Sequence, residues 1–339
     1  MGLRLGPKTI QFSSPPNILS SVSVAGKAEK KGAYGLSFDI TFDDDLWGEK
    51  TYELAERKML QKAVETAIEK ASLLPNDIHY LFGGDLLNQI ISSGFAAREL
   101  GIPFIGLYGA CSTMAESLMI GSMAVDGGFA QYAVCATSSH FATAERQFRY
   151  PLELGTPKPP TSQNTVSASG ATLLTSLRGN YPAVTHATTG RVVDMGINDV
   201  NNMGAAMAPA AAETIISHLE ETQRKDDYYD AIVTGDLGTF GSELLIQLTR
   251  DAGHSLASIH KDCGAMIYEG DPLAHCGGSG CGCAASMLNG YFLNEMRGGR
   301  LNKILFVATG ALHSPTSALQ GESIPSIAHA VSIEMGYGQ

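Results

Sequence analysis

The feature that most constrains the fold of this chain is an internal repeat. Residues 104–140 contain an apolar run, a small-residue turn, a helix-like stretch, a Gly-Gly pair and a second apolar run. From the turn onward, residues 278–313 follow the same plan, with Gly298-Gly299 in the place of Gly127-Gly128. Two copies of one plan predict two similar halves, with a site where their equivalent loops meet.

A shorter pair of segments supports the repeat. Residues 82–86, FGGDL, reappear as residues 233–237, VTGDL, and each copy follows a helical pattern and an acidic turn. At 339 residues, the chain exceeds the usual size of a single core and fits two closely packed subdomains. We therefore expect an N-terminal half over residues 1–180 and a C-terminal half over residues 181–339.

Helical and strand-like patterns alternate along most of the chain. The clearest helix covers residues 52–72, where apolar residues recur at helical spacing. Further helices are expected over residues 89–100, 112–125, 209–220 and 241–251, and strands over 78–82, 104–107, 132–138, 168–177, 181–193, 231–233 and 327–333. This alternation predicts an α/β fold with parallel sheets covered by helices on both faces. The proline-rich residues 145–164 are expected to form an irregular insertion over a site or at an oligomer contact.

Composition excludes several classes of protein. A net charge of −11 argues against nucleic acid as a partner, because phosphate binding needs a basic face. No apolar window reaches the roughly 18 residues needed to span a bilayer, and no signal peptide is visible. We therefore expect a soluble protein of cytoplasmic type, held at a membrane only through partners.

The six cysteines do not have the spacing of a small disulfide-rich domain. Cys276, Cys281 and Cys283 lie close to His275, which raises the question of a metal site. This spacing is too tight for the common zinc motifs, and the glycines between these residues indicate a crowded turn. We predict reduced thiols and no metal bound by the protein itself.

Cys111 is the strongest candidate for a functional residue. It lies directly between a predicted strand and a predicted helix, beside Gly109 and Ala110. A thiol at a helix N-terminus faces free backbone N–H groups and the positive end of the helix dipole, which favour thiolate. A buried, inert cysteine is the alternative, but the small neighbours leave space for a ligand.

These segments resemble a known superfamily. Gly-Ala-Cys-Ser before an Ala- and Met-rich helix, followed by Gly-Gly and an apolar strand, is similar to the nucleophile segment of thiolases and β-ketoacyl synthases. Within that superfamily, the whole chain resembles the family of stage V sporulation protein AD from spore-forming bacteria. The segments that support this are GACSTMAESLMIGSMAVDGG, CATSSHFATAERQFRYPLELG, LAHCGGSGCGCAAS and ALHSPTSALQGESIP.

The resemblance implies a fold and a function. The expected fold has duplicated βαβαβ halves that form a layered α-β-α-β-α core. The expected function is non-catalytic binding of dipicolinic acid (pyridine-2,6-dicarboxylate) for its uptake into the developing spore. The implied partners are membrane subunits of the same transport complex at the forespore or spore inner membrane. A homodimer is also implied, formed through the strand after the nucleophile helix, residues 132–138.

The chain departs from the catalytic members at three places. His275 resembles the histidine of the thiolase Gly-His-Pro segment, but Cys276 replaces the proline. Residues 235–238, GDLG, stand where synthases have His-Gln-Ala-Asn, and residues 310–313, GALH, stand where thiolases have a second cysteine. The usual partners of the thiolate are therefore missing. The alternative function is an acyltransferase that uses Cys111 as nucleophile and His275 as base, with coenzyme A as acyl carrier.

A dicarboxylate ligand suggests which residues bind it. Helix N-termini donate N–H groups to anions, and arginine recognises carboxylates with two parallel hydrogen bonds. Asp236 in such a site implies either a calcium contact, with calcium carried by the ligand, or a protonated acid. No other cofactor is expected. Arg149 and Arg191 are further candidates beside the predicted ligand-binding set of Cys111, Ser112, His140, Arg146, Asp236, His275 and His313.

Overall fold

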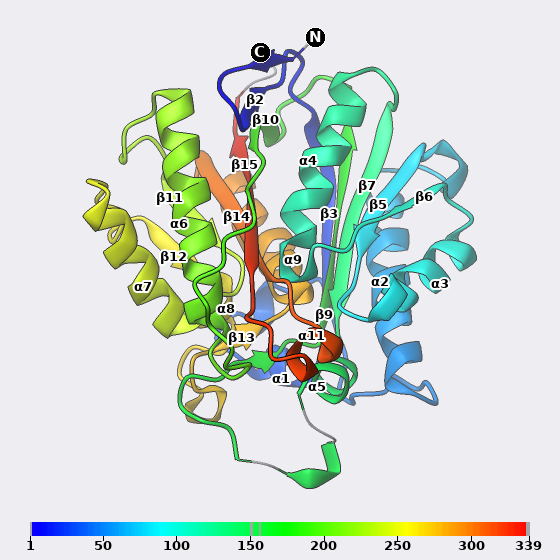
Figure 1. Cartoon of the computed structure of the whole chain (residues 1–339). Coiled ribbons are helices and arrows are strands. Elements are labelled where there is room, and N and C mark those ends of the chain that lie inside the picture. The colour runs from blue at the N-terminus through cyan, green and yellow to red at the C-terminus, as the bar shows by residue number, and fades with distance from the viewer. Residues whose placement is uncertain (1, 150–151, 156, 337–339) are drawn as a thin grey trace.

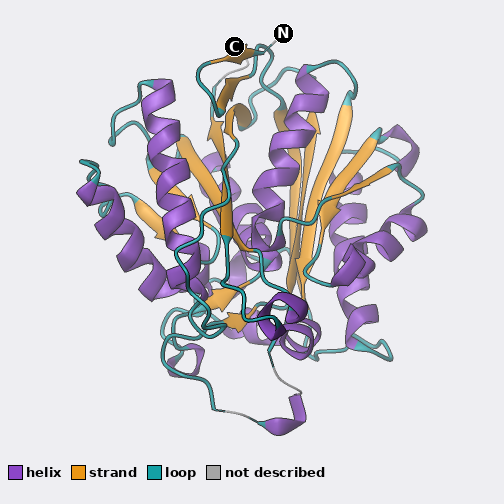
Figure 2. Cartoon of the chain, in the orientation of Figure 1, coloured by secondary structure: helices purple, strands orange, loops and turns teal. Residues whose placement is uncertain are grey.

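The computed structural model describes residues 2–149, 152–155 and 157–336, and its chain winds through a large twisted sheet with helices on both sides (Figures 1 and 2). The strands of this sheet are β1 (Leu3–Arg4), β2 (Thr9–Gln11), β3 (Asn17–Ala25), β4 (Ile40–Thr41), β5 (Tyr80–Gly84), β6 (Phe104–Gly106), β7 (Tyr132–Ser139), β9 (Ala168–Thr175), β10 (Ala183–Thr188), β11 (Ala231–Thr234), β12 (His260–Asp262), β14 (Lys303–Ala311) and β15 (Ser326–Glu334). A separate parallel pair consists of β8 (Asn164–Thr165) and β13 (Gly278–Ser279).

The helices alternate with these strands. They are α1 (Lys27–Lys31), α2 (Tyr52–Lys70), α3 (Ile91–Leu100), α4 (Thr113–Asp126), α5 (Phe141–Phe148), α6 (Met203–Thr222), α7 (Gly238–Asp251), α8 (Cys263–Ile267), α9 (Cys281–Met287), α10 (Leu293–Arg297) and α11 (Pro315–Leu319). A π-helical turn, Leu288–Phe292, joins α9 to α10.

The order of the strands repeats between the two halves of the sheet. The first half runs β6-β5-β7-β9-β3, and the second runs β12-β11-β14-β15-β10. In both halves the first three strands are parallel and the fourth is antiparallel to the third. The halves join where β3 meets β10. The internal repeat in the sequence therefore corresponds to a repeated strand order.

The helices form three layers around the two halves of the sheet. Helices α4 and α9 lie between the halves, α2 and α3 cover one outer face, and α6 and α7 cover the other (Figure 1). This is the layered α-β-α-β-α arrangement expected from the resemblance. It places the N-termini of α4 and α9, with Cys111 and Cys281 beside them, in the centre of the molecule.

Two glycines allow the central helix α9 to lie directly on the sheet. A Cβ on Gly282 would lie 2.3 Å from the carbonyl oxygen of Ala168, and one on Gly170 would lie 2.4 Å from that of Ala285. Real Cβ atoms do not approach oxygen so closely, so both positions exclude a side chain. The Gly- and Ala-rich composition of β9 follows from this packing.

The boundaries of several elements differ from those predicted, and those of α6 and β10 differ most. Helix α6 begins at Met203, where the Asn202 side chain accepts from the N–H of Ala205, and it continues through Pro209. The predicted start at Pro209 is too late. Proline is common in the first turn of a helix, but here the buried face of the helix begins before Pro209. Strand β10 ends at Thr188, five residues before the predicted end at Val193.

The predicted dimer contact through residues 132–138 is wrong. These residues form β7, which pairs with β5 on one side and β9 on the other, so no edge is left for a second copy. The edge strand of this half is β6.

The predicted insertion at 145–164 is partly helical, because α5 continues to Phe148. A 3₁₀ turn follows at Leu152–Leu154, and residues 150, 151 and 156 lie outside the described residues. Within the described part of the chain, no helix is both long enough and apolar enough to cross a bilayer.

Candidate functional site

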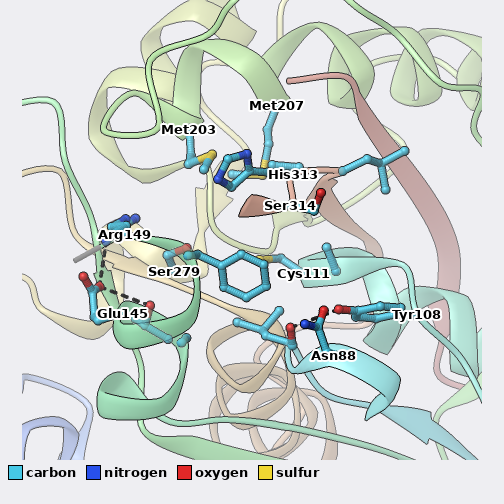
Figure 3. A pocket seen from close by; sticks show the side chains of 17 residues that line it. Asn88, Tyr108, Cys111, Glu145, Arg149, Met203, Met207, Ser279, His313 and Ser314 are labelled. Carbon is cyan, nitrogen blue, oxygen red and sulfur yellow. Dashed lines mark hydrogen bonds and ion pairs between the residues drawn. The ribbon is translucent and has the colours of Figure 1, made fainter. Parts of the chain in front are cut away.

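A cavity of about 270 Å³ opens beside Cys111, at the ends of strands from both halves of the chain (Figure 3). Its walls come from the loop after β5, the turn before α4, helices α5 and α6, and the segment after β14. The lining residues are Leu86, Asn88, Tyr108, Ala110, Cys111, Ala144, Glu145, Phe148, Arg149, Thr165, Met203, Met207, Ser279, Ala311, Leu312, His313 and Ser314.

Cys111 lies in the wall of this cavity with 8% of its surface exposed. It is held by a 3₁₀ turn, Ala110–Ser112, in which Ala110 has a φ of 52°. This left-handed conformation is unusual for a residue with a Cβ. It marks the turn between β6 and α4 as tightly constrained.

The thiol of Cys111 is protonated. Burial raises its pKa well above the usual value, and the nearby negative charge of Asp236 raises it further. A hydrogen bond from the N–H of Gly280 acts in the opposite direction but is the smallest of these effects. The thiolate predicted from the helix N-terminus is therefore disfavoured, because burial and a neighbouring carboxylate outweigh the helix dipole.

Asp236 lies behind Cys111 and does not line the cavity. Its carboxylate accepts hydrogen bonds from the Cys111 thiol, from the N–H of Gly280 at 2.8 Å, and from the hydroxyls of Thr309 at 3.2 Å and Ser279 at 3.3 Å. Burial raises the pKa of Asp236 to about 7, although these hydrogen bonds lower it. Its oxygens are thus occupied by hydrogen bonds behind the cavity wall, and a pKa near 7 allows both the protonated and the ionised form at neutral pH.

A buried group of charges forms one end of the cavity. Arg149 donates to the carboxylate of Glu145 at 2.7 Å and to the carbonyl oxygen of Gln163 at 2.7 Å. Lys158 lies 3.1 Å from the same carboxylate, and the side chains of Arg149 and Glu145 are only 7% and 5% exposed. Figure 3 shows Arg149 and Glu145 together at one end of the cavity, with Asn88 and Tyr108 at the other. The group carries one net positive charge.

His313 lies in the cavity wall above Cys111. Its ring hydrogen-bonds to the backbone of Phe148, and the Nε2 atom is buried without a hydrogen-bond partner among the described residues. Burial lowers the pKa of His313, so the imidazole is neutral at pH 7. A free ring nitrogen at the cavity is available to a ligand.

His140 and Arg146 do not reach the cavity. The Nδ1 atom of His140 accepts from the N–H of Ala142 at 3.1 Å, and its Nε2 atom is 2.8 Å from the carbonyl oxygen of Asp45. Both nitrogens therefore have partners: Nδ1 caps α5, and Nε2 bonds to the backbone of Asp45. Arg146 points to the surface and pairs with Glu53. Arg149 lies just after α5 with non-helical backbone angles (φ −124°, ψ −85°), and its side chain lines the cavity, whereas that of Arg146 within the helix does not.

Ser112, His275 and Arg191 also lie away from the cavity. The Ser112 hydroxyl donates to the carbonyl oxygen of Gly109 at 2.6 Å. His275 is exposed on a turn after a short 3₁₀ helix, and it does not line the cavity. Arg191 is 69% exposed and pairs with Glu213 at 3.1 Å. Of the predicted set, Cys111 and His313 line the cavity and Asp236 supports Cys111.

Sequence reasoning missed several cavity residues. Glu145 and Phe148 lie in the predicted insertion, and Met203 and Met207 lie before the predicted start of their helix at residue 209. The spacing of Glu145 and Arg149, four residues apart at the end of a helix, was a usable signal. All six cysteines are buried and free, and no cluster of metal-binding side chains occurs among the described residues.

Comparison with known proteins gives the family. The family model "Stage V sporulation protein AD (SpoVAD)" matches residues 6–334. Stage V sporulation protein AD of Bacillus subtilis (strain 168) is 45% identical over 333 residues, which cover 98% of each chain. The chain belongs to the SpoVAD family. It is therefore a sporulation protein.

Solved structures with the same fold are enzymes of the thiolase type. The 3-oxoacyl-[acyl-carrier-protein] synthase III of Aquifex aeolicus VF5 matches with a TM-score of 0.59, covering 94% of this chain and 99% of its own. A single-residue variant of OleA from Xanthomonas campestris matches with a TM-score of 0.62, covering 96% of this chain and 99% of its own. Both are 11% identical to this SpoVAD family member, so the likeness shows the fold alone.

Proposed function

We propose that the cavity at Cys111 binds dipicolinic acid without covalent chemistry, and that this member of the SpoVAD family serves the uptake of the acid into the developing spore. The observation that carries the proposal is that one cavity is lined both by the buried side chain of Arg149 and by the protonated thiol of Cys111. A guanidinium suits a carboxylate ligand, whereas a protonated thiol is a poor nucleophile.

The charged end of the cavity suits one carboxylate. Arg149 and Lys158 together exceed the single negative charge of Glu145 by one. A carboxylate from the ligand neutralises that excess and can receive the planar, paired hydrogen bonds of a guanidinium. Calcium carried by the ligand would neutralise its second carboxylate.

The remaining walls suit a flat ring. Phe148, Met203, Met207 and Leu86 present apolar surface. The imidazole of His313 lies beside Met203 and Met207 (Figure 3). A planar pyridine ring can stack on aromatic and thioether groups.

Calorimetry with dipicolinate tests this assignment. Cys111→Ser should keep the wild-type affinity, because the thiol forms no bond to the ligand, whereas Cys111→Trp should abolish binding by filling the cavity. Arg149→Gln should weaken binding by about tenfold or more. Arg146→Gln is the matched control, since Arg146 is exposed and lines a different surface groove. Unchanged affinity in the Cys111→Trp variant would refute the site.

Acyl transfer from coenzyme A is the competing function for this cavity. It needs a thiolate at Cys111 and a base beside it, but the thiol pKa is raised and His275 lies away from the cavity. Incubation with an acyl-coenzyme A and intact mass measurement separates the two functions. A stable acyl adduct on Cys111 would overturn non-covalent binding.

We further propose that the protein acts as a homodimer beside membrane subunits of its transport complex. Strand β6 offers an unpaired edge, and Ile105 within it and Tyr108 after it are 43% and 51% exposed. A second copy pairing there would extend the sheet. Sedimentation velocity should give a dimer for the wild type and a monomer for Ile105→Lys. Docking to the membrane subunits is tested by co-purification from detergent-solubilised forespore membranes.

A further inference from the structure

A second cavity, of about 210 Å³, lies between the N-terminal parts of α2 and α3. These two helices cover an outer face of the sheet (Figure 1). It shares no lining residue with the cavity at Cys111. Its lining residues are Thr51, Glu53, Leu54, Arg57, Ile91, Ser92 and Phe95.

Arg57 is the cation of this cavity. Its Nε atom is buried and has no hydrogen-bond partner, and the guanidinium forms no ion pair with the described residues. The acidic residues near Arg57 already have other partners. Glu53 pairs with Arg146, and Glu99 accepts two hydrogen bonds from Arg98 at 3.1 and 2.6 Å. The guanidinium N–H groups of Arg57 can therefore donate hydrogen bonds to a bound anion.

Ser92 supplies a second unused donor in the same cavity. The residue is 3% exposed, and its hydroxyl oxygen is buried with no hydrogen-bond partner in the part of the chain that the structure describes. The backbone N–H groups of Ser92 and Ser93 both bond to Asp85, so only the Ser92 hydroxyl remains for a ligand. A buried hydroxyl without a partner destabilises the folded state, and a bound acceptor would remove this cost.

Apolar side chains complete the walls. Ile91 and Phe95 are 44% and 41% exposed, and Leu54 faces them from α2. The volume lies below the roughly 300–1,000 Å³ typical of sites for drug-sized molecules, so the ligand is small. Glu53 in the wall opposes a dianion such as phosphate, whereas a single guanidinium suits one monoanionic carboxylate.

We propose that this second cavity binds a small monocarboxylate attached to an apolar group. Arg57 pairs with the carboxylate, the Ser92 hydroxyl donates a further hydrogen bond to it, and Ile91 and Phe95 hold the apolar group. A free organic acid and the C-terminal carboxylate of an apolar peptide share this chemistry. The proposal is independent of dipicolinate binding at Cys111.

Methyl NMR of the full-length protein tests it, with benzoate, benzamide and N-acetylphenylalanine as probes. The Ile91 methyl signals report on the second cavity, and those of Met203 and Met207 report on the first. Benzoate should shift the Ile91 signals with saturation, and benzamide should bind at least about tenfold more weakly. Binding of N-acetylphenylalanine as well would indicate a chain terminus as a natural source, whereas benzoate alone would indicate a free acid.

Variants identify the donors. Arg57→Leu should weaken benzoate binding by about tenfold or more, and Ser92→Ala by a smaller factor. Lys62→Gln removes one charge from the same helix outside both cavities and should leave the affinity unchanged. No shift of the Ile91 signals at millimolar benzoate, or equal affinity in Arg57→Leu, would overturn the proposal.

Discussion

Cys111 and Asp236, one from each half of the chain, form a hydrogen bond in which the thiol donates to the carboxylate. Asp236 is the repeat equivalent of Asp85, which instead caps the loop before α3 through Leu87 and Ser93. The same sequence motif thus supports the cavity in one half and a surface helix in the other.

Removing the charge of Asp236 should activate the thiol. In Asp236→Asn we expect a lower Cys111 pKa than in the wild type, because the neighbouring negative charge is lost while burial remains. Alkylation of Cys111 by iodoacetamide, followed by peptide mass analysis over a range of pH, measures this pKa. Thr309→Val removes a hydrogen bond to Asp236 but no charge, and should have less effect. An Asn variant that reacts no faster than the wild type would contradict the electrostatic explanation.

Asp236 should also make the stability of the protein depend on pH. Its pKa of about 7 in the folded state lies above the usual value of 3.8, so the folded state binds more protons between these values. The contribution to stability is therefore fully present below about pH 4 and is lost as the pH rises to about 7, a change of a few kcal/mol.

Urea unfolding at about pH 5 and pH 8 measures this dependence. Other buried acids such as Glu56 and Asp85 have raised pKa values and act in the same direction. The informative quantity is therefore the free energy of unfolding of the wild type minus that of Asp236→Asn, which should fall from the lower pH to the higher pH. A constant difference would show that Asp236 does not titrate in this range.

The surroundings of two glycines predict opposite effects of substitution by alanine. Gly282→Ala should destabilise the protein by about 1–3 kcal/mol, because the new methyl group meets the carbonyl oxygen of Ala168. Gly94→Ala should stabilise it by about 0.5–1 kcal/mol, because Gly94 lies in α3 with open space around it. Denaturant unfolding compares both variants with the wild type. If Gly282→Ala were as stable as the wild type, α9 could move away from β9 without a loss in the free energy of unfolding.

The affinity for dipicolinate should depend on pH because of His313. Its lowered pKa keeps it neutral at pH 7, and an anionic ligand favours the charged imidazolium. Affinity should therefore rise as the pH falls from about 7 to about 5.5, and His313→Gln should show a flatter profile after correction for protonation of the ligand. Parallel profiles for the two proteins would exclude His313 from contact with the ligand.

Local patterns were enough for most of the fold. Apolar spacing predicted α2 to within two residues of its observed end at Lys70, and the Gly-Gly pairs marked the loops before β7 and β14. The edge strand of the sheet could not be identified in this way, because a strand pattern does not reveal whether its edges are already paired.

By itself, the sequence determined the repeated α/β architecture, the position of Cys111 in a constrained turn, and the family. Only the tertiary structure decided which charged side chains reach the cavity. Arg146 and Arg149 are three residues apart on one short segment, yet one pairs with Glu53 at the surface and the other with Glu145 in the cavity. The physical reason is that local spacing fixes a direction around the helix axis, whereas burial and partners depend on the segments that pack against it. The same holds for the Cys111 thiol, whose protonation depends on burial and on a carboxylate from the other half of the chain.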